Sequence, residues 1–154
     1  HKKRPMTIRQ AQKEDVISIV AMLADDELGR LREDFRKPLP ESYYQAFQTI
    51  YEDPHQSLMV MEKEGQVIGT LQLTLIPYLT YQGGIRAQIE AVRIHKDYRG
   101  QGIGEQLFRW AIAEAQRKGA HLIQLTTDKK RPDALRFYEK LGFKASHEGM
   151  KLHF

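Results

Sequence analysis

Hydrophobic residues recur at helical spacing in four segments of the chain. The pattern is clearest over 103–118, where Leu107 and Ala111 fall on one face and Gly119 can end a helix. The same spacing predicts further helices over three ranges: 15–24, 42–52 and 133–141. Residues 25–40 are highly charged and contain prolines at their end, so we expect a loop or a short helix there.

Short apolar and β-branched runs predict strands between these helices. The runs 57–61 and 67–76 flank Gly65, whose backbone suits a turn, and together they predict a β-hairpin. The run 85–95 has the pattern of a mostly buried strand and leads directly into a glycine-rich loop. Further strands are expected over 6–9 and 122–126, with one or two more within 143–154.

The order of these elements indicates the fold class. It runs β, two helices, three strands, α, β, α, β, which is typical of an α/β or α+β sandwich. With 154 residues the chain is near the size of one domain, and we assign 6–154 to it. Residues 1–5, which precede Met6, are interpreted as a tag remnant or a short basic tail.

Composition excludes several classes of function. The hydrophobic fraction of 41% and the charged fraction of 29% are those of an ordinary folded protein. The sequence has no cysteine, which excludes disulfides, thiolate metal sites and a cysteine nucleophile. Because there is no apolar run of roughly 20 residues and no signal-peptide core, we expect a cytoplasmic protein with no membrane partner.

The charges and histidines narrow the choice of ligand. A formal net charge of +4 permits an anionic partner and is consistent with a phosphorylated cofactor. No nucleic-acid-binding motif is present, so we expect no nucleic acid partner. His95, His121 and His147 lie at the ends of predicted elements without the spacing of metal ligands, and no metal is predicted.

Three glycines stand where the buried strand meets the best helix. Gly100, Gly102 and Gly104 let a ligand approach the backbone, and the free N–H groups of a helix start suit a pyrophosphate. A tight turn without a ligand is the alternative. Dinucleotide and ATP binding are minor alternatives, because the P-loop pattern is absent and Glu105 occupies the place of a third fingerprint glycine.

Three segments carry a resemblance to a known family: Val92-Arg93-Ile94, the pattern Arg99-x-x-Gly102-x-Gly104, and Ala134-Leu135-Arg136-Phe137-Tyr138-Glu139-Lys140-Leu141-Gly142-Phe143. They resemble the two signature regions of GNAT acetyltransferases, in the right order, and the resemblance covers roughly residues 57–146. It implies a mixed, mostly antiparallel sheet of six to seven strands with helices on both faces.

The resemblance also implies an activity. The chain would be an N-acetyltransferase that moves the acetyl group of acetyl-CoA to a primary amine, by direct transfer in a ternary complex. A small-molecule acceptor is preferred, because the chain is compact. Two alternatives stay open: a protein or peptide amine as the acceptor, and a non-catalytic acetyl-CoA-binding regulatory module.

The family pattern places the cofactor along the strand and the glycine loop. The strand would pair with pantetheine, and the loop amides would hold the pyrophosphate. The cofactor-binding set is Val92, Arg93, Ile94, Arg99, Gly100, Gln101, Gly102, Ile103, Gly104, Glu105, Arg131 and Ala134. Arg131 stands where the family often has asparagine, and it would either meet CoA phosphates or belong to a solvated basic loop.

Two residues are assigned to catalysis. Tyr138 occupies the family's position for the general acid that protonates the departing thiolate. Its alternative is an aromatic core residue, because only one of Phe137 and Tyr138 is expected to reach the site. Glu90 would remove a proton from the amine, directly or through water, or else pair with Arg86 or Arg93. A backbone amide near Val92 would polarise the thioester oxygen.

The acceptor side and the assembly are less defined. Five carboxylates within 25–34 would suit a cationic amine, or form a solvated face. Tyr78, Tyr81 and the glycines Gly83 and Gly84 suggest either a mobile loop near the opening or an ordinary connection between strands. The resemblance suggests a homodimer, in which the tail 150–154 pairs two copies; the same tail would equally complete the sheet of one copy.

Overall fold

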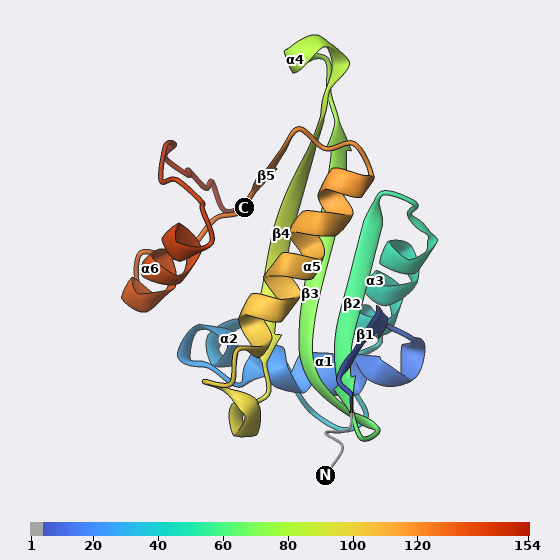
Figure 1. Ribbon diagram of the computed structural model, residues 1–154. Helices are drawn as coiled ribbons and strands as arrows, with labels where there is room; N and C mark the ends of the chain where they lie inside the picture. The colour runs from blue at the N-terminus through green and yellow to red at the C-terminus, as the bar shows by residue number, and fades with distance from the viewer. Residues whose placement is uncertain (1–4) are drawn as a thin grey trace.

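One five-stranded sheet organises the molecule (Figure 1). The computed structural model describes residues 5–154, apart from the side chain of residue 132, so most of the predicted tail at 1–5 lies outside the described residues. The strands follow one another in chain order: β1 (Thr7–Gln10), β2 (Gln56–Lys63), β3 (Gln66–Pro77), β4 (Ile85–Ile94) and β5 (Leu122–Gln124). The pairings from β1 to β4 are antiparallel, and β4 pairs with β5 in parallel.

Helices cover both faces of this sheet. The helices of the described residues are α1 (Val16–Ala24), α2 (Glu27–Arg32), α3 (Glu41–Glu52), the short α4 (Thr80–Gly83), α5 (Ile103–Arg117) and α6 (Pro132–Lys140). In Figure 1, α4 lies at the end of β3 and β4, and α6 lies beside the sheet. Two short 3-10 turns, η1 (Lys13–Asp15) and η2 (Lys96–Tyr98), precede α1 and the glycine loop. The charged stretch 25–40 contains the short helix α2, which begins after Asp26 because that side chain accepts a hydrogen bond from the Gly29 N–H.

Each face of the sheet has its own hydrophobic core. In Figure 1, α5 lies in front of the sheet, and α1 and α3 lie behind it. Leu107 and Ala111 of α5 are fully buried against Leu71 of β3. On the opposite face, Val20 of α1 and Phe47 of α3 are buried in a second cluster. The helical spacing seen in the sequence therefore marks the faces that cover the sheet.

A β-bulge in β4 redirects the end of that strand. Ala91 has a φ of +54°, and the register between β3 and β4 shifts between Thr70 and Gln72. Ile89 belongs to the core under α5, and Val92, three residues later, packs against the same core. Side chains of a regular strand alternate, so an odd step between residues on one face requires the extra residue of a bulge. The bulge thus leaves Arg93 on the face opposite α5.

The expected six to seven strands and the strands within 143–154 are corrected by the structure. Among the described residues the sheet has five strands, and 143–154 contains none. Met150, Leu152 and Phe154 alternate as in a strand, yet they are largely exposed. A strand needs a hydrogen-bonded neighbour, and β5 is only three residues long, so the alternating pattern alone does not produce one.

Candidate active site

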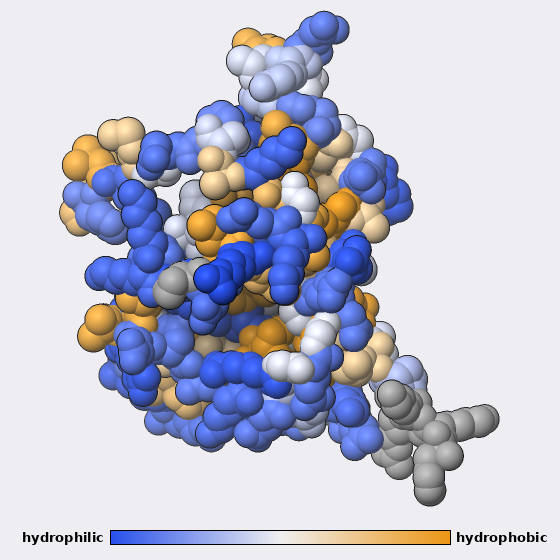
Figure 2. Space-filling model, turned by 60° about the vertical axis from the view of Figure 1, so that its left-hand side comes forward, coloured by the Kyte–Doolittle hydropathy of each residue, from blue (hydrophilic) through white to orange (hydrophobic). Residues whose placement is uncertain are grey.

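The glycine loop, the end of β4 and α6 enclose an open pocket of about 400 Å³. Figure 2 brings this side of the molecule forward and shows a recess with hydrophobic surface inside a hydrophilic rim. The lining residues are Val92, Ile94, Tyr98, Arg99, Gly100, Gly102, Ile103, Gly104, Glu105, Phe108, Phe137 and Tyr138. Most of the predicted cofactor set is therefore brought together in one place, beside Tyr138.

Two glycines shape the loop through their backbone conformation. Gly100 has a φ of +78° and Gly102 a φ of +77°, in the left-handed region that favours glycine. Gly102 caps α5, and its carbonyl accepts the first helical hydrogen bond from the Gln106 N–H at 3.1 Å. The N–H groups of the first turn have no partner within the helix, so they are available to an anion at the pocket.

Strand β4 offers an open backbone edge beside this loop. Its pairing with β5 ends at Gln88, which lies opposite Gln124. The following residues of β4, among them Val92 and Ile94, line the pocket. Backbone groups at such an edge can accept an extended ligand as an added strand.

Tyr138 projects from α6 into the pocket together with Phe137. The expectation that only one of them reaches the site is wrong, because both residues line the pocket. Both rings also pack on Phe108, at centroid distances of 5.5 Å for Phe137 and 5.4 Å for Tyr138. Burial raises the pKa of the Tyr138 hydroxyl, and the positive charges of Arg131 and Arg93 oppose this rise. The phenol is therefore protonated at neutral pH and can donate a proton.

Glu90 lies outside the pocket lining. Its side chain is exposed and accepts a hydrogen bond from Gln88 Nε2 at 2.6 Å. Among the ion pairs of residues 5–154, Glu90 pairs with neither Arg86 nor Arg93. The guanidinium carbon of Arg86 lies 4.6 Å from the ring centroid of Tyr78 instead. Because Glu90 follows Ile89 and precedes the bulge, it shares the sheet face of Arg93.

An ion-pair cluster joins β4, α6 and the start of α2 on that face. Asp26 Oδ2 accepts a hydrogen bond from Arg131 Nη2 at 2.9 Å and lies 3.4 Å from Arg93 Nε. Burial raises the pKa of Asp26, but the Gly29 N–H and the two guanidinium groups outweigh it, so the pKa lies below its usual value. Asp26 is therefore ionised at neutral pH.

This cluster changes the interpretation of two sequence features. Arg131 neither stands free in solvent nor lines the pocket, because it is bound to Asp26. The acidic segment is largely neutralised by arginines, since four of its five carboxylates lie within ion-pair distance of one. Local sequence gave no signal for the Asp26–Arg131 contact, whose partners are 105 residues apart.

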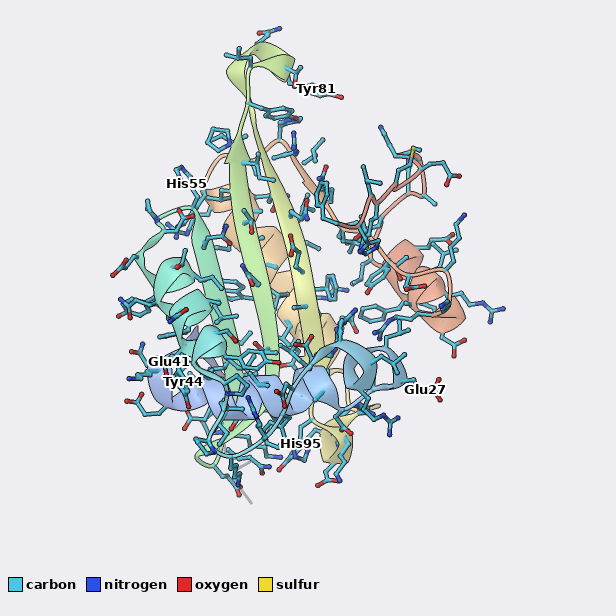
Figure 3. All side chains as sticks on the ribbon, turned by 180° about the vertical axis from the view of Figure 1, so that it is seen from behind. Glu27, Glu41, Tyr44, His55, Tyr81 and His95 are labelled. Carbon is cyan, nitrogen blue, oxygen red and sulfur yellow. The ribbon has the colours of Figure 1, made fainter. Side chains whose placement is uncertain are left out.

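The remaining predicted residues and the loop of Tyr78 lie elsewhere. Gln101 and Ala134 do not line the pocket. Tyr98 and Phe108 do line it, although no sequence motif marked them. Figure 3 shows Tyr81 at one end of the sheet and His95, next to the glycine loop, at the other. The aromatic loop is therefore not near the opening of this pocket.

Membrane and metal features are not found in the described part of the chain. None of its helices has the length and apolar character needed to cross a bilayer. Within residues 5–154, no three histidine or acidic side chains gather as metal ligands would.

Comparison with known proteins identifies the family of this chain. The model of the acetyltransferase (GNAT) family matches residues 26–143. An aminoalkylphosphonate N-acetyltransferase of Salmonella typhimurium is 33% identical over 140 residues, which are 91% of this chain and 86% of that protein. A glucosamine 6-phosphate N-acetyltransferase of Trypanosoma brucei brucei is 34% identical over 57% of this chain and 58% of its own length.

A solved structure from Bacillus halodurans, described as a transcriptional regulator, has a TM-score of 0.95 and 59% identity, covering 97% of this chain and 100% of that one. The family match spans well over half of the sequence and includes the glycine loop and α6. The chain therefore belongs to the GNAT family and is an N-acetyltransferase.

Proposed function

We propose that the protein transfers the acetyl group of acetyl-CoA to the primary amine of a small molecule, directly within a ternary complex. The observation that carries this proposal is one pocket that joins the glycine loop, the open edge of β4 and Tyr138. These are the three parts that a pyrophosphate, a pantetheine arm and a departing thiolate require.

The chain's own residues fit acetyl-CoA. An added Cβ at Gly100 or Gly102 would meet no protein atom within 4 Å, so the loop leaves space in front of its backbone. The first-turn amides of α5 and the nearby Arg99 would hold phosphate oxygens, and the edge of β4 would hold the pantetheine amides. Acetyl-CoA supplies the thioester whose C–S bond breaks as the C–N bond forms.

Two proton movements accompany this exchange. The attacking amine must lose a proton, because a free alkylamine has a pKa near 10 and is mostly protonated at neutral pH. Glu90 would accept that proton directly or through water, and Tyr138 would donate its hydroxyl proton to the leaving sulfur. A backbone N–H near Val92 would stabilise the charge on the thioester oxygen.

The environment of Tyr138 suits this role. A free thiol has a pKa of about 8.5, below that of a phenol, so full transfer to a solvated thiolate would be unfavourable. Burial disfavours charge on sulfur as well as on the phenol, and Arg131 and Arg93 lower the pKa of Tyr138 against burial. The hydroxyl can therefore share its proton with the sulfur as the C–S bond breaks.

A small-molecule acceptor is supported by the two related enzymes. Their names specify an aminoalkylphosphonate and glucosamine 6-phosphate, each a small amine. A peptide or protein amine is the alternative acceptor class. The two classes are separated by comparing free amines with peptides of the same amine in one assay.

The test measures CoA release from acetyl-CoA over a panel of primary amines. Tyr138→Phe should lower amine-dependent release by about 10²-fold or more, with acetyl-CoA affinity retained, because the variant keeps the ring and loses only the donor. Tyr51→Phe is the matched control, since Tyr51 lies half exposed on α3. Equal rates in the two variants would remove Tyr138 from the mechanism.

A regulatory role is the second candidate, favoured by the description of the Bacillus halodurans structure. It predicts acetyl-CoA binding without acetylation of any amine in the panel. It also predicts that Tyr138→Phe leaves the affinity for acetyl-CoA unchanged. Amine-dependent CoA release by the wild-type protein would contradict a purely regulatory role.

A further inference from the structure

The arginine cluster beside the pocket is arranged for a ligand. Arg93 and Arg131 share the single carboxylate of Asp26, so their charges are not balanced within the cluster. Arg32 adds a further positive charge that acts on Arg93. The pKa of Arg93 is lowered, mainly by burial. Asp26 raises this pKa, whereas repulsion from Arg131 and Arg32 lowers it. An anion placed here would relieve that repulsion.

The donors of Arg93 are incompletely used. Its Nη1 donates to the carbonyl oxygen of Val92 at 2.8 Å, but its buried Nε makes no hydrogen bond in the described part of the chain. The 3.4 Å approach to Asp26 is an ion-pair contact without hydrogen-bond geometry. Because this Nε is enclosed by protein, a ligand oxygen would meet the Arg93 guanidinium at Nη2, which makes no hydrogen bond to the described residues.

The cluster also lies where an acceptor must lie. Both arginines act electrostatically on the Tyr138 hydroxyl, and Tyr138 lines the pocket. The bulge at Ala91 turns Arg93 to the sheet face opposite Val92 and Ile94, so the proposed cofactor strand separates the arginines from the glycine loop. The acceptor would therefore approach Tyr138 from the side of α2 and Glu90.

Resting on the function proposed above, we infer that Arg93 and Arg131 bind a phosphate or phosphonate group of the acceptor and thereby orient its amine toward the thioester. Two guanidinium groups match the several oxygens of a tetrahedral dianion through charge-assisted hydrogen bonds. Asp26 holds the two arginines in place from the other side. The acceptor class is an amine that carries a phosphoryl or phosphonyl group a short distance away.

The experiment compares three amines of equal chain length that differ in their anion: 2-aminoethylphosphonate, β-alanine and propylamine. Binding is measured by titration calorimetry, and KM and kcat are measured by CoA release. We expect the phosphonate to bind most tightly. Arg93→Gln and Arg131→Gln should each raise its Kd and KM about 10- to 100-fold relative to the KM for propylamine. The kcat for both amines should fall together, because the two arginines also lower the pKa of Tyr138.

Arg30→Gln is the matched control, because this substitution also removes one positive charge and Arg30 lies exposed on α2. Thermal melts identify a variant that fails to fold, and the half-exposed Arg131 provides a second variant if Arg93→Gln unfolds. The inference is overturned if the three amines bind equally, or if the Arg30 variant loses as much affinity as the other two.

Two further outcomes separate this inference from the function on which it rests. Loss of acetyl-CoA affinity in the Arg93 and Arg131 variants, with phosphonate binding intact, would assign the arginines to CoA phosphates and overturn the inference alone. Arginine-dependent binding of the phosphonate without CoA release from any amine would overturn the acceptor role together with the proposed function.

Discussion

Substitution of Gly102 by alanine separates the loop's role in binding from its role in folding. Gly102 adopts a φ of +77° at the start of α5, and the left-handed conformation costs a residue with a Cβ about 1 kcal/mol. No protein atom lies within 4 Å of the added Cβ, so no steric cost is added to the backbone cost. The melting temperature should fall by about 3 °C.

The effect on the ligand should be larger. The same Cβ would project from a residue that lines the pocket and would push phosphate oxygens away from the first-turn amides. Losing one hydrogen bond to a charged group weakens binding by about 1.5–3 kcal/mol, which is about 10- to 100-fold in Kd. Titration calorimetry with acetyl-CoA measures this change.

Gly119→Ala is the control at the other end of the same helix. Gly119 has a φ of +86°, an added Cβ there would also meet nothing within 4 Å, and the residue does not line the pocket. Both variants should lose similar stability, but only Gly102→Ala should lose acetyl-CoA affinity. Equal affinities in the two variants would refute the placement of the pyrophosphate at this loop.

Two further predictions concern acid stability and the catalytic base. Burial raises the pKa of Asp15, but the bidentate Arg9 guanidinium, at 2.7 and 3.0 Å, and the Gln12 N–H hold it below the ordinary value. The stability that the ionised Asp15 carboxylate gives the folded state is therefore complete above the unfolded pKa of about 3.9. It is lost as the pH falls through the folded pKa. The free energy of unfolding, measured with urea, should fall less between pH 7 and pH 3 for Asp15→Asn than for the wild type. An equal fall in the two proteins would contradict this. Glu90→Gln should lower kcat/KM for the amine by about 10²-fold at neutral pH if the carboxylate takes the proton, and a change below about threefold, measured by CoA release, would assign that step to water.

Local sequence determined the parts of this protein that depend on neighbouring residues. The spacing of Leu107 and Ala111 specified the buried face of α5, and Gly65 specified the turn between β2 and β3. Gly100 and Gly102 marked the loop because glycine adopts a positive φ at lower cost than residues that carry a Cβ. These features follow from helix periodicity and backbone sterics, which act over a few residues.

Tertiary structure alone decided the features that depend on distant partners. Nothing local predicts the bulge at Ala91, because alanine has no preference for a positive φ, and only the pairing with β3 imposes it. The alternating residues 150–154 form no strand, because a strand requires a neighbour with which to exchange hydrogen bonds. The meeting of Asp26 with Arg93 and Arg131 likewise arises only when β4, α2 and α6 pack together, since ionic contacts between distant residues leave no periodic pattern in the sequence.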